Sequence, residues 1–299
     1  AEAGLPVLGA NMSTNHRPRR SVLYMPGANA RALEKSRTLP ADGLIFDLED
    51  AVAPDAKLTA LRQIVDAVEA GAYGKREIFI RTNGLNTPWG YDDLVAAAKA
   101  GPDAVLLPKV ESAEMVRQAE SVLLAHGASP NMAIWCMMET PRGMLHAEEI
   151  ADASPRLGGL VMGTSDLAKD LQAQHTAMRL PLITALGLCL LAARAARIGI
   201  LDGVYLDLND HEGFVDSCRQ GAELGFDGKT LIHPKQLAAT NEVFAPSEDE
   251  LRLSRRIIDA YAQAEAEGKG VVVVDGKLIE KLHVDHAKRV VALAEAIQA

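Results

Sequence analysis

Short apolar runs alternate with amphipathic stretches along most of the chain. The runs are continuous, as in Leu-Ile-Phe-Asp-Leu and Ala-Val-Leu-Leu-Pro, which is typical of parallel strands covered on both faces. They predict strands at 21–25, 43–47, 77–81, 104–108, 133–138, 159–162, 203–207 and 228–232. The stretches between them predict helices at 30–38, 55–70, 91–100, 113–126, 143–150, 175–198 and 212–224.

Eight strand signals, each followed by a helix or an extended loop, predict an α/β protein with a closed (β/α)₈ TIM barrel. An open doubly wound sheet is the alternative. It is disfavoured because no Gly-x-Gly-x-x-Gly turn follows an early strand. Polar residues also follow the ends of many different strands, which is where barrel enzymes carry their chemistry.

The pattern divides the chain into three parts. Residues 1–17 are polar and predict a poorly ordered lead-in, 18–246 the barrel, and 247–299 a C-terminal extension. Within the extension we expect a charged helix at 247–268, a short hairpin turning at Asp275-Gly276, and a last helix at 283–297. The barrel has no slot for this extension, so we expect it to pack on a neighbouring subunit or over the barrel mouth.

Composition narrows the class of protein. Of the 299 residues, 48% are hydrophobic and 24% charged, which excludes a disordered or fibrous chain. The net charge of −9 argues against a surface that binds nucleic acid or anionic membranes, although it does not exclude a local basic pocket. The three cysteines are widely spaced among apolar neighbours, and no apolar run is long enough to span a bilayer. We therefore expect a soluble, cytoplasmic protein.

Polar side chains follow the predicted strands at the point where each ends. They are Pro26-Gly27-Ala28-Asn29, Asp47-Leu48-Glu49-Asp50, Arg81-Thr82-Asn83, Lys109 with Glu111, Glu139-Thr140, Gly163-Thr164-Ser165-Asp166 and His233-Pro234-Lys235. In a barrel these ends meet at one mouth. The predicted mouth is rich in carboxylates, with an arginine and two lysines facing them.

Crowded carboxylates repel one another unless a cation lies among them. Glu139 and Asp166 follow neighbouring strands, which suits two ligands of one ion. Oxygen ligands without histidine or cysteine favour a hard cation, foremost Mg²⁺ completed by water and substrate oxygens. Glu49 and Asp50 could then hold water molecules bound to the metal.

Structural interpretations of the same residues stay open. The two carboxylates could instead form surface ion pairs with Arg142 or Lys169. Arg81 follows a buried strand, so it is either a structural partner of Asp47 or Glu49, which spacing slightly favours, or a fork for an anionic substrate oxygen.

A second set of residues offers positive charge near the first and last strands. Arg31 and Lys35 lie in the helix after Gly27 and could receive phosphate, although a solvated helix face explains them equally well. His233-Pro234 follows the last predicted strand, and these two residues could simply end that strand.

Seven motifs in order carry a resemblance. They are Arg20-Ser-Val-Leu-Tyr-Met-Pro-Gly, Ile45-Phe-Asp-Leu-Glu-Asp-Ala-Val, Ile80-Arg-Thr-Asn-Gly, Leu107-Pro-Lys-Val-Glu-Ser, Glu139-Thr-Pro-Arg-Gly, Gly163-Thr-Ser-Asp-Leu and Leu231-Ile-His-Pro-Lys-Gln. Together they resemble the citrate lyase β-subunit-like family, the acyl-CoA lyases of the wider HpcH/HpaI aldolase superfamily. The match begins at about residue 18 and covers nearly all of the chain from there.

The resemblance implies a Mg²⁺-dependent TIM barrel, commonly a homotrimer or hexamer. Such enzymes make or break a C–C bond in malyl-, citramalyl- or citryl-CoA. It implies that Glu139 and Asp166 are the metal ligands and that Arg81 clamps the carboxylate half of the substrate. The residues implied to hold the CoA thioester are Tyr24, Arg31, Lys35, His233 and Pro234.

The C-terminal extension resembles the family's Met-Ile-Asp segment, whose aspartate acts as acid or base in a neighbouring subunit's site. Here the matching run is Lys277-Leu-Ile-Glu280, with glutamate in place of aspartate. Glu280 thereby becomes the implied proton-transfer group, and the longer side chain shifts its reach. Since the chemistry needs no Schiff-base lysine, Lys109 is interpreted as an electrostatic support.

These expectations give three candidate functions. The first is a lyase that splits a β-hydroxyacyl-CoA into acetyl-CoA or propionyl-CoA and a 2-oxo acid. The alternative is a thioesterase that hydrolyses (3S)-malyl-CoA or a similar ester. The third is a non-catalytic subunit that binds CoA esters.

Overall fold

The computed structural model describes residues 17–299 and divides into two compact units. One consists of Arg19–Asn241 and the other of Glu242–Ala299. The predicted lead-in at 1–17 lies outside the described residues except for its last position. Within the described part of the chain, no helix is both long and apolar enough to cross a membrane.

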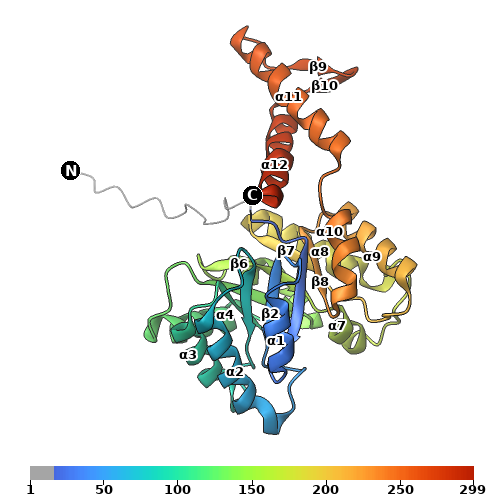
Figure 1. Cartoon of the computed structure of the whole chain (residues 1–299). Helices are drawn as coiled ribbons and strands as arrows, with labels where there is room; N and C mark the ends of the chain where they lie inside the picture. The colour runs from blue at the N-terminus through green and yellow to red at the C-terminus, as the bar shows by residue number, and fades with distance from the viewer. Residues whose placement is uncertain (1–16) are drawn as a thin grey trace, which may run out of the picture. The chain divides into compact units, whose positions relative to one another are not determined.

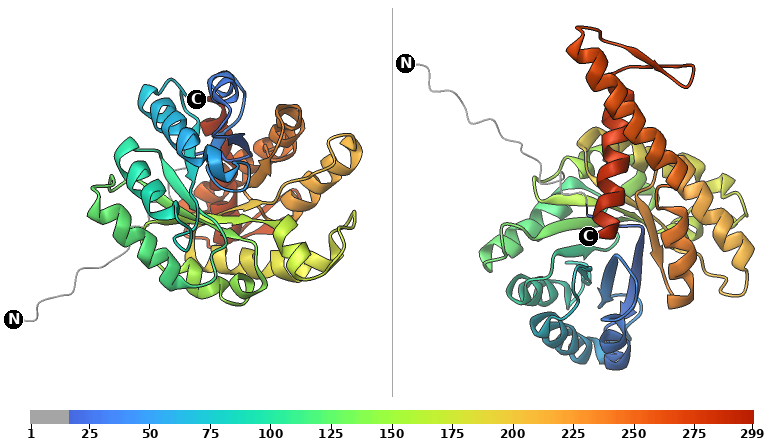
Figure 2. Two further views of the ribbon diagram at one scale, coloured as in Figure 1. Left: turned by 90° about the horizontal axis from the view of Figure 1, so that it is seen from below. Right: turned by 45° about the horizontal axis from the view of Figure 1, so that its top comes forward.

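The first unit is a closed barrel of eight parallel strands in chain order, with helices between them (Figures 1 and 2). β8 pairs with β1 and closes the ring, with Lys229 beside Ser21. The strands are β1 (Ser21–Pro26), β2 (Gly43–Asp47), β3 (Glu77–Arg81), β4 (Ala104–Leu107), β5 (Ala133–Met138), β6 (Leu157–Met162), β7 (Gly199–Asp202) and β8 (Gly228–Leu231). The predicted (β/α)₈ fold is confirmed.

The helices of this unit follow the strands in turn, and they are amphipathic or short except for α8, which is apolar on nearly all sides. They are α1 (Ala30–Ser36), α2 (Lys57–Ala70), α3 (Gly90–Ala100), α4 (Ala113–Ala125), α5 (Pro141–Leu145), α6 (Ala147–Ala151), α7 (Thr164–Asp170), α8 (Ile183–Ala196), α9 (His211–Leu224) and α10 (Leu237–Val243). Short 3-10 turns precede α2, α8 and α10 at Pro54–Ala56, Leu180–Leu182 and Pro234–Gln236. Because every strand is covered by a helix, the continuous apolar runs are buried on both faces.

The barrel interior is filled by large side chains around Trp135. Its ring packs edge-on against Phe79, with ring centroids 5.4 Å apart. A Cβ atom at Gly159 would lie 2.3 Å from the Trp135 ring, and one at Gly199 would lie 2.8 Å away. Glycines on β6 and β7 therefore provide the room that lets a tryptophan occupy the barrel core.

One predicted strand is wrong. The run at 203–207 was expected to form the seventh strand, but β7 is Gly199–Asp202. The preceding helix α8 ends at Ala196, and Arg197 adopts a left-handed backbone with φ 59° that turns the chain directly into the strand. Two apolar runs follow each other here, and only the first pairs with both β6 and β8.

Two predicted helices also differ from the structure. The helix expected at 143–150 is divided into α5 and α6 at His146, whose φ and ψ of −108° and 15° are not helical. The helix expected at 175–198 begins only at Ile183, after the turn Leu180–Leu182. Apolar periodicity continued through both irregular segments, so the pattern alone did not reveal them.

The C-terminal unit contains α11 (Glu248–Ala266), a hairpin of β9 (Val272–Val274) and β10 (Lys277–Ile279), and α12 (Lys281–Gln298). The predicted turn is confirmed, since Asp275 and Gly276 both have positive φ, as a tight two-residue hairpin requires. Val274, Ile279 and Val284 form a small core against residues of α11.

Candidate functional site

Glu139 is held rigidly at the end of β5. Directly after it, Thr140 caps α5 by accepting a hydrogen bond from the Gly143 N–H (3.0 Å), and Pro141 fills the first helical position. Glu139 is only 3% exposed, and its Oε1 accepts a 2.7 Å hydrogen bond from the Lys109 backbone N–H. Strand, cap and hydrogen bond together fix where this carboxylate points.

Gly163 allows the end of β6 to approach Glu139 closely. A Cβ atom at Gly163 would lie 2.4 Å from the Glu139 Cβ and 2.6 Å from its Oε2. Three residues further on, Asp166 lies in the first turn of α7, where a carboxylate suits the helix dipole. The predicted relation is thus present: the two acidic residues come from adjacent strand ends.

Lys109 follows β4 and contacts carboxylates on both sides. Its Nζ lies 2.5 Å from Glu49 Oε1, 3.4 Å from Asp50 Oδ2 and 4.0 Å from Asp166 Oδ2. The carboxylates of Glu49 and Asp50 pull its pKa upward, although burial acts in the opposite direction. Within residues 17–299, Lys109 rather than Arg142 or Lys169 is therefore the cation beside Asp166.

Arg81 ends β3 and forms a fork with the acidic end of β2. Its Nε and Nη2 donate to the two carboxylate oxygens of Asp47 at 2.7 and 2.6 Å, and its Nη1 lies 3.2 Å from Glu49 Oε2. Burial opposes the charge, but Tyr24 and the carboxylates of Asp47 and Glu49 outweigh it and raise the pKa of Arg81. A guanidinium has five N–H donors, so this pairing leaves donors for one further anion. Arg81 is therefore a structural partner of Asp47 and Glu49, and this pairing does not use all of its N–H donors.

Electrostatics make Glu139 different from an ordinary surface carboxylate. Burial raises its pKa to about 7, while the Lys109 N–H and the Arg81 charge act in the opposite direction. A buried carboxylate that is costly to ionise gains strongly from a nearby cation.

The acidic side chains fit a hard divalent cation. Their donor atoms are all carboxylate oxygens, which Mg²⁺ prefers. No group of three or more His, Cys, Asp and Glu side chains forms a complete metal cage among residues 17–299. If Glu139 and Asp166 held such an ion, two carboxylates would leave its other positions to water and substrate oxygens.

The loops that carry these groups are held in place by Lys57, Asn83 and Asp93, of which the sequence analysis named only Asn83. Lys57 donates from its Nζ to the carbonyl oxygens of Leu48 and Glu49, both at 2.7 Å. Asn83 donates to the Leu48 carbonyl at 3.0 Å and to Asp93 at 2.7 Å. A lysine at the start of a helix and an aspartate inside one carry no distinguishing pattern, so nothing in the sequence marked Lys57 or Asp93.

The residues expected to hold a CoA thioester lie in different surroundings. Tyr24 packs inside the barrel, where its ring centroid is 4.9 Å from the Arg81 guanidinium carbon, and burial raises its pKa. Its hydroxyl donates to the Met137 sulfur at 3.3 Å. Arg31 and Lys35 are exposed on α1. The close approach at Gly27 serves packing, since a Cβ there would lie 2.5 Å from Ile64.

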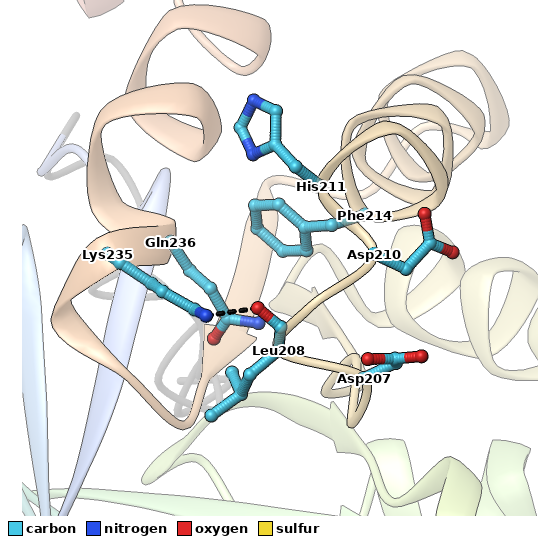
Figure 3. Close-up of a pocket in the computed structure, with 7 residues that line it drawn as sticks. All are labelled: Asp207, Leu208, Asp210, His211, Phe214, Lys235 and Gln236. Atoms are coloured by element: carbon cyan, nitrogen blue, oxygen red, sulfur yellow. Dashed lines mark hydrogen bonds between the residues drawn. The ribbon is translucent and has the colours of Figure 1, made fainter.

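His233 and Pro234 begin the short turn after β8, beside a cavity of about 140 Å³. Its walls are Asp207, Leu208, Asp210, His211, Phe214, Lys235 and Gln236 (Figure 3). The Lys235 ammonium donates to the Leu208 carbonyl, and two of the lining residues are aspartates (Figure 3). Two carboxylates and an occupied lysine make this cavity a poor phosphate site, so the cations of α1 suit phosphate better.

Glu280 belongs to the C-terminal unit, where it is the exposed N-cap residue of α12. Its backbone N–H donates to the His283 Nδ1 at 3.0 Å. The backbone of Glu280 is therefore fixed, and the residue lies at the surface of its unit.

Comparison with known proteins places this geometry in a family. The model for the HpcH/HpaI aldolase/citrate lyase family matches residues 20–234, which carry every barrel strand and all the carboxylates of the mouth. The chain belongs to this family.

Two relatives within it differ in reaction. A (3S)-malyl-CoA thioesterase of Cereibacter sphaeroides is 50% identical over 288 residues, covering 96% of this chain and 99% of the relative. The citrate lyase subunit beta of Escherichia coli K12 is 38% identical over 284 residues, covering 93% of this chain and 94% of the relative.

Two solved structures resemble most of the chain, covering 94% and 77% of it. Protein CitE of Mycobacterium tuberculosis, in complex with magnesium, acetoacetate and coenzyme A, superposes with a TM-score of 0.75. It is 29% identical, and the match covers 94% of this chain and 99% of CitE. The citrate lyase beta subunit of the same organism, complexed with oxaloacetate and magnesium, has a TM-score of 0.65.

Proposed function

We propose that this protein is a Mg²⁺-dependent enzyme that hydrolyses the thioester of a β-hydroxyacyl-CoA such as (3S)-malyl-CoA. The observation that carries the proposal is the buried Glu139 carboxylate at the barrel mouth, which accepts from the N–H of Lys109, whose ammonium lies 4.0 Å from Asp166, and which feels the charge of the Arg81 fork. A magnesium ion held by Glu139 and Asp166 would supply Lewis-acid charge to the substrate's oxygen atoms.

Arg81 orients the acid end of the substrate. Its guanidinium is fixed by Asp47 and Glu49, so its remaining N–H groups are aimed without further loss of side-chain freedom. A substrate carboxylate accepts from these groups and takes one defined orientation in the mouth. The CoA phosphates pair with the exposed Arg31 and Lys35 on α1, and His233 and Pro234 border the thioester arm.

Hydrolysis needs a base, and Glu280 is our assignment. Its carboxylate takes a proton from water, the water oxygen bonds to the thioester carbonyl carbon, and the C–S bond breaks. The CoA thiolate then takes a proton, which yields free malate and CoA. In the family resemblance this residue comes from a neighbouring subunit, so we propose a homotrimer or hexamer with shared sites.

Carbon–carbon cleavage is the second candidate, and the citrate lyase relatives favour it. In that reaction a water molecule takes the β-hydroxyl proton, the C–C bond breaks, and Glu280, in its protonated form, gives a proton to the carbon of the resulting thioester enolate. The products are then a 2-oxo acid and acetyl-CoA or propionyl-CoA. We rank hydrolysis first because the thioesterase relative is 50% identical along nearly its full length, against 38% for the lyase subunit.

Product analysis separates these reactions. The protein is incubated with malyl-, citramalyl- and citryl-CoA, with MgCl₂ or with a chelator, and products are resolved by mass. Free malate and CoA thiol in the magnesium sample alone support hydrolysis, whereas glyoxylate and acetyl-CoA support the lyase. Binding of the esters without either set of products overturns the enzymatic proposal in favour of a CoA-ester-binding subunit.

A further inference from the structure

Lys109 contacts the acidic residues of the mouth through both its backbone and its side chain. Its backbone N–H donates to Glu139, and its ammonium faces Glu49, Asp50 and Asp166. The residue adopts a left-handed backbone with φ 49°, which is uncommon for a lysine. A hydrogen bond to the carboxylate of a buried residue keeps this unusual backbone conformation in place, and such conformations gather at functional sites.

We propose that the Lys109 ammonium is a built-in counter-ion, which balances the acidic residues in the metal-free protein and swings out when a divalent cation binds. This inference rests on the metal site of the proposed function. It adds an exchange: one positive group leaves as another arrives.

The contacts of the neighbouring residues permit this exchange. If the ammonium leaves, Glu49 keeps its ion pair with Arg81 at 3.2 Å. Glu139 keeps the Lys109 N–H, because that bond comes from the backbone and does not depend on the side chain. Asp50 is 61% exposed and is solvated by water. Asp166 loses the ammonium as its ion-pair partner, and the arriving cation takes the place of that charge. No buried carboxylate therefore loses all its partners.

The solvent exposure of Lys109 also permits this exchange. Its side chain is already 46% exposed, so the ammonium can rotate fully into water, where it is hydrated and the long side chain regains its mobility. A divalent cation bound to Asp166 would lie close to an ammonium only 4.0 Å from the same carboxylate, and the two positive charges repel.

A permanent salt bridge is the competing interpretation, and it makes the opposite prediction. If Lys109 only holds the loops in place, its removal would loosen Glu49 and Asp166 and weaken cation binding. If it competes with the cation, its removal strengthens binding. The sign of the change in affinity decides between them.

The experiment measures Mg²⁺ binding to the full-length protein by titration calorimetry at low salt. Lys109→Met is compared with wild type and with Lys169→Met, which removes the same charge from an exposed position on α7 close in sequence to Asp166. We expect Lys109→Met to bind Mg²⁺ about tenfold more tightly or better, because a charge within about 4 Å is removed. Lys169→Met should bind within about twofold of wild type.

A second measurement reports on the metal-free state. Without Mg²⁺, Lys109→Met should melt at a lower temperature than wild type, and saturating Mg²⁺ should remove most of the difference. Lys109→Asn serves as a second variant, since asparagine tolerates the left-handed backbone better than methionine. Equal or weaker Mg²⁺ binding by both variants, folded by circular dichroism, overturns the exchange.

Failure of the proposed function gives a different result. If the wild-type protein binds no Mg²⁺, or if Glu139→Gln binds it as well as wild type, the metal site itself is wrong. If wild type binds Mg²⁺ through Glu139 and only the Lys109 variants fail to bind it more tightly, the metal site stands and the counter-ion role is rejected.

Discussion

Arg81 and Asp47 are direct register partners at the ends of β3 and β2, and they form a bidentate ion pair with N–O distances of 2.7 and 2.6 Å. Strand pairing thus places an arginine fork at the barrel mouth, and its charge partner comes from the neighbouring strand. Asp47 also accepts from the Glu49 N–H at 2.9 Å, so the same pair shapes the acidic loop.

This pair gives the first prediction. Arg81→Lys retains a positive charge but loses the planar fork, so we expect kcat/KM to fall about a hundredfold, since a misplaced clamp costs that much. Arg81→Ala leaves the buried Asp47 carboxylate without its counter-charge and should lower the free energy of unfolding by about 3–5 kcal/mol. Steady-state kinetics and urea unfolding check both values. Arg81→Lys with wild-type kcat/KM would remove the clamp assignment.

Glu139→Gln separates metal binding from stability. The amide keeps an oxygen that can accept from the Lys109 N–H, and it removes a charge that burial disfavours. We therefore expect Mg²⁺ binding and Mg²⁺-dependent turnover to be lost while the metal-free melting temperature stays the same or rises. Asp166→Asn should lose the same two properties. Glu148→Gln, an exposed position on α6, is the control and should bind Mg²⁺ normally.

The sequence predicted the arrangement of the mouth because barrel geometry is periodic. Once eight strand signals are recognised, the residues after each must meet at one end, and Glu139, Asp166 and Arg81 follow from that rule alone. Individual contacts do not follow from it. The position of the Lys109 ammonium depends on a left-handed backbone at a non-glycine residue, and no pattern in the sequence encodes that conformation.

The seventh strand shows a second limit. Ile198-Gly-Ile-Leu-Asp and Gly203-Val-Tyr-Leu-Asp are similar apolar runs placed one after the other, and only pairing with β6 and β8 decides between them. That choice also buries Asp202, whose role could not be inferred while β7 was misplaced. Tertiary pairing overrode local propensity here.

Asp202 and Lys229 form a fully buried ion pair between β7 and β8 at 2.9 Å, and Arg179 adds a second contact to Asp202 at 2.6 Å. Asp202→Asn leaves the Lys229 ammonium without its counter-charge, so we expect a loss of about 3–5 kcal/mol in unfolding free energy at pH 7. Replacing both partners, in Asp202→Asn with Lys229→Met, should recover part of this loss. No loss in the single variant would contradict the prediction.

The same pair has a definite pH dependence. Burial alone would raise the pKa of Asp202, but Lys229 and Arg179 outweigh it and hold the pKa below its usual range. A depressed folded-state pKa stabilises the fold above the unfolded value of about 3.9 and ceases to do so as the pH falls through the folded value. The stability difference between wild type and Asp202→Asn should therefore be constant from pH 7 to about pH 5 and shrink below about pH 4. Urea unfolding across this range measures it.

Glu280 tests whether two subunits share a site. Glu280→Gln changes only an exposed N-cap residue, so folding should be unaffected, while turnover should fall about a hundredfold or more, as for a lost acid or base. Glu139→Gln should be inactive for a different reason, the loss of a metal ligand.

If each site takes its barrel from one subunit and Glu280 from another, mixed oligomers of the two inactive variants contain some intact sites. Joint unfolding and refolding of the two should then restore a measurable fraction of wild-type activity, while each variant refolded alone stays inactive. Activity that never returns, despite mixed oligomers verified by native mass spectrometry, would place Glu280 and the metal ligands of one site in the same subunit.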